Sequence, residues 1–169
     1  CWVGVNTALP NKLIKLAIEA GCFKEEFGTI SVIKQEVPYG QNRSSRIDLL
    51  LSPDKTNSDK RSIFVEVKNT TWTKGSLALF PDTITSRGQK HLKELMNLIP
   101  NERGVLIPCI SRDDAEIFVP GDSADKTYGD LFRQALDKGL EVFPCAFGFY
   151  QDCIKWKGKR TFLKRETFS

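Results

Sequence analysis

Apolar residues recur at helical spacing in three parts of the chain. We therefore expect helices over residues 10–20, 86–98 and 128–138. The residues that cap, start or stop these helices are Asn6 or Thr7, Pro10, Gly21, Pro100 and Gly139. The apolar stripe of the middle helix, which predicts the face that packs against a sheet, consists of Leu92, Leu95, Met96 and Ile99.

Runs of apolar and β-branched residues predict strands between these helices. Two segments rich in turn-forming residues, PYGQNRS and SPDKTNSDK, separate the first three strands and predict hairpin-like connections. The predicted strands cover residues 29–37, 46–51, 62–69, 104–110, 117–119 and 140–147. The resulting order, αβββαβ with additions, predicts an α/β protein with a mixed β-sheet flanked by helices.

Composition adds limits to this picture. A chain of 169 residues with 40% hydrophobic residues is long enough for one well-packed domain and short for two. It begins at Cys1 rather than methionine, and we expect an N-terminal part to be missing. No apolar stretch approaches the roughly 20 residues that span a bilayer, so we expect a cytoplasmic protein without a membrane partner. Five widely spaced cysteines with one histidine argue against zinc and against a disulfide framework.

Charged residues inside two of the predicted strands are the main candidate chemistry. Asp48 lies in SRIDLLL, and Glu66 and Lys68 lie in IFVEVKN. Because side chains alternate along a strand, Glu66 and Lys68 project to the same face. Two carboxylates can hold Mg²⁺, and a nearby lysine can orient a water beside a phosphate. The alternative is a cross-strand ion pair on a solvated sheet face. Long apolar flanks predict central strands, where an unpaired charge is costly, and favour a shared cation.

The second helix starts with SRGQKHL, an unusual first turn. Its free N–H groups and dipole favour an anion, so basic side chains there suit a phosphate. The alternative is an ordinary basic turn that is merely tolerated. His91 by itself is either a satisfied surface histidine or a proton carrier. The residues that we assign to nucleic-acid binding are Arg46, Arg87, Gln89, Lys90 and His91. Gln89 lies one turn before Leu92 and could reach the metal site.

The net charge of +4 fits an anionic partner, and much of the excess lies near the C-terminus. We expect residues 151–169 to form a basic tail. Its lysines and arginines alternate with Trp156 and Phe162, a mixture that could contact phosphates and stack on bases. The alternative is a solvated, partly disordered tail that serves only solubility.

The positions of Asp48 and of Glu66-Val-Lys68 resemble the PD-(D/E)XK motif of the restriction-endonuclease-like, or nuclease-like, fold. Ile47 stands where that motif often has proline, and the literal Pro81-Asp82 pair lies in a predicted loop and is a decoy. The resemblance implies that Asp48 and Glu66 are metal ligands and that Lys68 positions the attacking water or stabilises the phosphate. Glu36, near the end of the first predicted strand, is a possible third ligand or a surface glutamate.

Longer segments resemble the sugar fermentation stimulation protein family, up to about residue 149. They are WVGVNTALPN, SRIDLLL, FVEVKNTTW and FPDTITSRGQKHLKEL. The resemblance implies nonspecific DNA binding, a nuclease-like domain over residues 1–150, and an N-terminal OB-fold domain that is absent from this chain.

Three functions remain open on these grounds. The first is a Mg²⁺- or Mn²⁺-dependent nuclease that acts on DNA or another phosphodiester. The second is a noncatalytic, nonspecific DNA-binding regulator of sugar metabolism genes, which predicts binding without cleavage and a steep salt dependence. The third is a metabolic protein whose metal site serves a small phosphorylated ligand.

Overall fold

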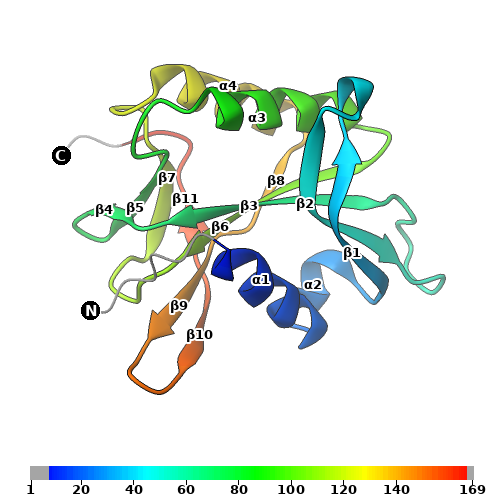
Figure 1. Ribbon diagram of the computed structural model, residues 1–169, viewed down its shortest axis with the longest axis horizontal. Coiled ribbons are helices and arrows are strands. Elements are labelled where there is room, and N and C mark those ends of the chain that lie inside the picture. The colour runs from blue at the N-terminus through cyan, green and yellow to red at the C-terminus, as the bar shows by residue number, and fades with distance from the viewer. Residues whose placement is uncertain (1–7, 167–169) are drawn as a thin grey trace.

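A computed structural model describes residues 8–166 (Figure 1). A seven-stranded mixed sheet forms its centre, in the order β1-β2-β3-β6-β9-β10, with β8 paired to β6. Its first three strands are antiparallel, whereas β6 runs parallel to β3. The strands are β1 (Ile30–Tyr39), β2 (Ser45–Pro53), β3 (Ile63–Thr70), β6 (Arg103–Ile110), β8 (Glu141–Val142), β9 (Cys145–Phe149) and β10 (Ile154–Lys159). The predicted mixed α/β architecture is confirmed.

Helices cover both faces of this sheet (Figure 1). The pair α1 (Leu9–Glu19) and α2 (Lys24–Phe27) lies on one side, and the pair α3 (Ser86–Leu98) and α4 (Lys126–Lys138) lies on the other. The proposed caps Asn6 and Thr7 lie outside the described residues. The α3 helix has the predicted bounds and is capped by the Thr85 side chain, which accepts a hydrogen bond from the Gly88 N–H.

Two hydrophobic cores follow from this layering. The first joins α1 and α2 to the sheet and contains Ile63, Val65 and Val67, the apolar side of β3 that alternation predicted. The second lies beneath α3 and α4, where Leu92 and Leu95 of the predicted stripe pack with Leu106. Glu66 and Lys68 therefore project toward the α3 side of a central strand.

A second, four-stranded sheet was not predicted. Its order is β11-β7-β5-β4, and it lies to the left in Figure 1. Two of its strands are only three and four residues long, so they carry little periodic signal. The strands are β4 (Trp72–Lys74), β5 (Leu77–Phe80), β7 (Ile117–Pro120) and β11 (Thr161–Phe162).

The C-terminal part of the chain differs from its prediction. The last predicted strand divides into β8 and β9, and residues 154–162 form β10 and β11 rather than a tail. Trp156 packs edge-on against Phe23 and Phe147, so its ring belongs to the core. Phe162 likewise packs against Phe132. Both aromatic residues are half-buried in these contacts, and residues 154–162 form strands rather than a disordered extension.

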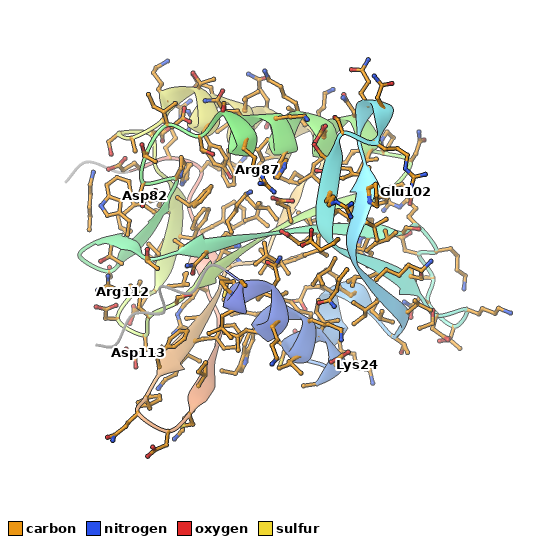
Figure 2. The ribbon with its side chains drawn as sticks, viewed as in Figure 1. Lys24, Asp82, Arg87, Glu102, Arg112 and Asp113 are labelled. Carbon is orange, nitrogen blue, oxygen red and sulfur yellow. The ribbon has the colours of Figure 1, made fainter. Side chains whose placement is uncertain are left out.

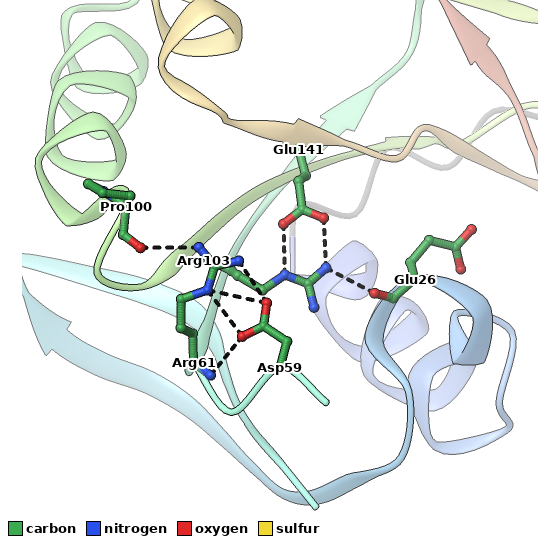
Figure 3. A network of polar contacts seen from close by, with 6 residues as sticks. All are labelled: Glu26, Asp59, Arg61, Pro100, Arg103 and Glu141. Carbon is green, nitrogen blue, oxygen red and sulfur yellow. Dashed lines mark hydrogen bonds and ion pairs between the residues drawn. The ribbon is translucent and has the colours of Figure 1, made fainter. Parts of the chain in front are cut away.

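Polar contacts fix the end of the sheet where β3 and β6 begin (Figure 3). Arg103 donates to both carboxylate oxygens of Glu141, at 2.6 and 2.8 Å, and to the Glu26 carbonyl at 2.9 Å. Arg61 binds Asp59 and the Pro100 carbonyl. This cluster joins α2, β8 and two loops. Because each arginine already has a carboxylate partner, the cluster offers little free positive charge.

Within residues 8–166 every cysteine is free, and Cys109 and Cys145 are buried. Across the same residues, no helix has both the length and the apolar character needed to cross a membrane.

Candidate active site

Strands β2 and β3 bring the two predicted carboxylates together. Their pairing runs through Leu49 opposite Val65, and continuing this register places Asp48 opposite Glu66. Beyond that point, a hydrogen bond from β3 to the Asp48 side chain replaces the backbone hydrogen bonds between the two strands. Asp48 Oδ2 accepts this hydrogen bond from the Val67 N–H at 2.7 Å. Asp48 thus sits at the point where the two strands separate.

A residue of α1 completes the support of Asp48. Asn11 Nδ2 donates to Asp48 Oδ1 at 2.8 Å. Burial, followed by the negative charge of Glu66, raises the pKa of Asp48 to about 6, although the bonds from Val67 and Asn11 lower it. No sequence pattern indicated Asn11, because only the fold brings the first turn of α1 to β2.

Glu66 is the most buried acid of the site, with 2% of its surface exposed. Its Oε1 accepts from Lys68 Nζ at 2.6 Å and lies 2.5 Å from His91 Nδ1 of α3. Burial raises the pKa of Glu66, but the hydrogen bond from His91 and the charge of Lys68 outweigh it and lower the net pKa. The interpretation of Glu66 as part of a solvated surface ion pair is therefore wrong.

The other oxygen of Glu66 differs from Oε1 in its surroundings. Oε2 is buried and accepts no hydrogen bond from the described residues. The hydroxyls of Tyr39 and Tyr128 are also buried without partners. Burial, and then the charge of Glu66, raise the pKa of both tyrosines, which stay neutral. A buried carboxylate oxygen without a donor is costly, and a cation would offset that cost.

The site fits Mg²⁺ or Mn²⁺ as a two-carboxylate centre. Within residues 8–166, no three acidic, histidine or cysteine side chains form a group that could hold a metal ion by themselves. Mg²⁺ is commonly held by one or two carboxylates and completes its shell with water, so Asp48 and Glu66 are a sufficient protein contribution.

Glu36 stands apart from this pair. The β1–β2 pairs on either side are Gln35 with Leu49 and Val37 with Ile47, so Glu36 lies level with Asp48 without pairing with it. Its φ is +51° and its side chain is exposed. Its carbonyl accepts from Arg46 Nη1 at 2.8 Å. The structure brings Glu36 to the neighbourhood of the site without joining it to the two carboxylates, and its role as third ligand stays a prediction.

A cationic cleft adjoins the carboxylates. It has a volume of about 530 Å³ and lies between the turn before β2 and the first turns of α3. His91 lines it and also contacts Glu66, so the cleft and the carboxylate site share a wall. Arg87, one of its cations, is labelled at α3 in Figure 2. The lining consists of Ser44, Ser45, Arg46, Ser86, Arg87, Lys90 and His91.

Four of the five residues predicted to bind nucleic acid therefore line one cleft, and Gln89 does not. Its Nε2 donates to both oxygens of Asp125, at 2.9 and 3.1 Å. Asp125 is also the N-cap of α4 and accepts from the Thr85 N–H. The structure thus directs Gln89 to a contact between α3 and α4, away from Asp48 and Glu66. The Pro81-Asp82 pair lies in the loop before α3, as expected of a decoy (Figure 2).

Comparisons with known proteins agree on one family. The model of the "Sugar fermentation stimulation protein RE domain" matches residues 8–152. A sugar fermentation stimulation protein homolog from Prochlorococcus marinus is 68% identical over 99% of this chain and 66% of its own length. A homolog from a Synechococcus species is 63% identical over 98% of this chain and 66% of its own length. The chain thus spans about two thirds of the length of these relatives.

A solved structure has the same architecture. It is SfsA from Pyrococcus furiosus in complex with Ca²⁺, with a TM-score of 0.84 and 27% identity. The match covers 94% of this chain and 66% of that one. A mixed sheet flanked by helices is therefore shared with a protein whose structure was solved in complex with a divalent cation.

Proposed function

Because the chain belongs to the sugar fermentation stimulation protein family, we propose that it is a DNA-binding protein with a nuclease-like, divalent-cation site that cleaves phosphodiesters. The observation that carries this proposal is the buried Glu66, one of whose oxygens has no hydrogen-bond partner among the described residues. It lies beside Asp48 and Lys68 and contacts His91, which lines a cationic cleft. The Ca²⁺ in the related Pyrococcus structure supports a divalent cation here.

In this proposal the fold is of the PD-(D/E)XK type, and Asp48 and Glu66 hold Mg²⁺ or Mn²⁺. When bound, the cation supplies positive charge for the phosphate and lowers the pKa of a bound water. The backbone of Val67 and the amide of Asn11 hold Asp48 in place. Lys68, which is fixed by Glu66 and lies 5.7 Å from the Phe80 ring centre, orients the attacking water or stabilises the phosphate.

The cleft supplies substrate binding. Arg46, Arg87 and Lys90 present positive charge, and the serines among its lining residues present hydroxyls, all of which suit phosphate oxygens. These groups suit the phosphate backbone, which every sequence shares, so the proposal is for backbone binding with little sequence preference. Several cations along one cleft, which meets the carboxylate site at His91, suit a phosphodiester polymer better than a small phosphorylated ligand.

The test is cleavage of labelled single- and double-stranded DNA with Mg²⁺ or Mn²⁺ by the parent protein and by Glu66→Gln and Lys68→Met. Binding is followed by gel shift in the same samples. We expect cleavage by the parent, its loss in both variants, and retained binding. Binding without cleavage in all three proteins, across substrates and metals, would leave a noncatalytic DNA-binding regulator. Binding of a phosphorylated metabolite without affinity for DNA would overturn the proposal.

A further inference from the structure

His91 has an unusual position for a residue in the second turn of a helix that begins with basic residues. Only 4% of its surface is exposed, and its Nδ1 lies 2.5 Å from Glu66 Oε1. It also lines the cationic cleft. One ring therefore touches the buried carboxylate and borders the space assigned to the substrate backbone.

The chemistry of Glu66 determines which way the hydrogen bond runs. Oε1 of Glu66 lies 2.6 Å from the Lys68 ammonium, and a carboxylate paired with a cation only accepts hydrogen bonds. His91 Nδ1 must therefore carry a proton and donate it to Oε1. Lys68 Nζ and His91 Nδ1, which lie 3.4 Å apart, are then both donors, so they form no hydrogen bond with each other.

Both donors bind the same oxygen of Glu66. Oε1 accepts from Lys68 and His91, whereas Oε2 is buried and has no hydrogen-bond partner among the described residues. Lys68 is the next residue but one along the same strand and can move with Glu66. His91 comes from α3, which packs on the sheet through Leu92 and Leu95, so it is the contact that ties Glu66 to a second element.

We propose that His91 is a positioning residue that holds Oε1 of Glu66 and thereby leaves Oε2 free to bind the divalent cation. This inference rests on the proposed function and reassigns His91, which the sequence placed among the nucleic-acid-binding residues. Groups that orient metal ligands typically change metal affinity by 10–100-fold when they are removed.

Two amide substitutions distinguish a positioning role from a substrate contact. The Asn amide nitrogen can occupy the place of Nδ1, whereas the Gln amide nitrogen reaches the place of Nε2. If His91 acts through Glu66, His91→Asn preserves the function and His91→Gln does not. If His91 acts by touching the substrate from the cleft wall, the order is reversed. His91→Leu removes both contacts.

The experiment measures Mn²⁺ affinity by calorimetry, and kcat and KM for DNA cleavage, for the parent and the three variants. We expect Mn²⁺ affinity to fall 10–100-fold in His91→Leu and in His91→Gln and to stay within about fivefold in His91→Asn. We expect kcat to follow the same order with KM for DNA nearly unchanged. Parent-like Mn²⁺ affinity in His91→Leu, or rescue by Gln alone, would overturn the proposal.

A second measurement does not depend on cleavage or on metal. The parent, His91→Leu, Glu66→Gln and the double variant form a cycle of unfolding equilibria in the metal-free protein. A positioning contact predicts that the effects are non-additive by at least a factor of about ten in the unfolding equilibrium constant. Additive effects would overturn the His91 proposal even if the parent cleaves DNA. A parent that binds no Mn²⁺ would overturn both this inference and the proposed function.

Discussion

Asp48 accepts a hydrogen bond from the backbone N–H of Val67, the residue that follows Glu66, at 2.7 Å. The strand that carries the second carboxylate therefore fixes the first. This contact keeps two acids close to each other, and the charge of Glu66 contributes to the raised pKa of Asp48. A cation shared between them, as we propose, would relieve the repulsion that the fold imposes.

The raised pKa of Asp48 predicts a pH-dependent stability in the metal-free protein. The pKa is about 6 in the folded state and 3.8 as the ordinary value, so the folded state binds the proton more tightly. The contribution of the protonated Asp48 to the free energy of unfolding is complete below about pH 4 and is lost as the pH rises through about 6. Glu66, whose pKa is lowered, acts in the opposite direction. Comparison with Asp48→Asn isolates the Asp48 contribution.

Urea unfolding at pH 4 to 7 measures this difference. We expect the stability of the parent relative to Asp48→Asn to fall by up to about 3 kcal/mol over this range. A constant difference between the two proteins would contradict the assigned environment of Asp48.

The cationic cleft predicts how DNA affinity depends on salt. Arg87→Ala and Lys90→Ala should each weaken DNA binding and reduce the slope of log K against log salt concentration by about 0.9 if each side chain neutralises one phosphate. Lys24→Ala is the matched control, because Lys24 lies on α2, on the other side of the sheet (Figure 2). Equal salt slopes for all four proteins would show that DNA binds elsewhere.

Gln89 supplies a sharper control within the same helix turn. Its amide is engaged with Asp125, so Gln89→Ala should leave DNA affinity within about twofold of the parent while lowering stability by about 0.5 to 1.5 kcal/mol. Fluorescence anisotropy with a labelled oligonucleotide and thermal unfolding report the two effects. A loss of DNA affinity as large as that of Lys90→Ala would return Gln89 to the substrate site.

We predict that Arg103 and Arg61, the two arginines of Figure 3, contribute unequally to the stability of the fold. The side chain of Arg103 is 11% exposed and pairs with Glu141 through two bonds, so Arg103→Ala should cost roughly 1 to 3 kcal/mol. Arg61 and Asp59 are largely exposed, and Arg61→Ala should cost less than about 1 kcal/mol. Denaturant unfolding compares them, with Mn²⁺ affinity expected to stay unchanged in both. Equal losses would contradict a structural role specific to Arg103.

Much of the architecture follows from sequence periodicity, and part of the site does too. Alternation placed Glu66 and Lys68 on one face of β3, and the apolar stripe of α3 matched the observed core. Periodicity could not show that α3 places His91 against Glu66 or that Gln89 turns toward Asp125, because both depend on how α3 is rotated on the sheet. The support of Asp48 by Asn11 likewise joins residues 37 positions apart.

Composition gave a wrong prediction for the C-terminal residues, because their burial depends on contacts with other segments of the chain. The basic residues near the C-terminus suggested an extension, but Trp156 and Phe162 become half-buried against other rings when β10 pairs with β9 and β11 with β7. Short strands such as β4 and β5 are stabilised mainly by neighbours in their sheet, so their own residues give a weak signal.

The central claim is that Asp48 and Glu66 form one divalent-cation site, and calorimetric titration with Mn²⁺ at pH 7.5 tests it most directly. The parent should bind one Mn²⁺, Asp48→Asn and Glu66→Gln should each lose most of that binding, and Glu36→Gln shows whether the exposed glutamate takes part. Unchanged Mn²⁺ binding in both Asp48→Asn and Glu66→Gln, with their fold intact, would contradict the account.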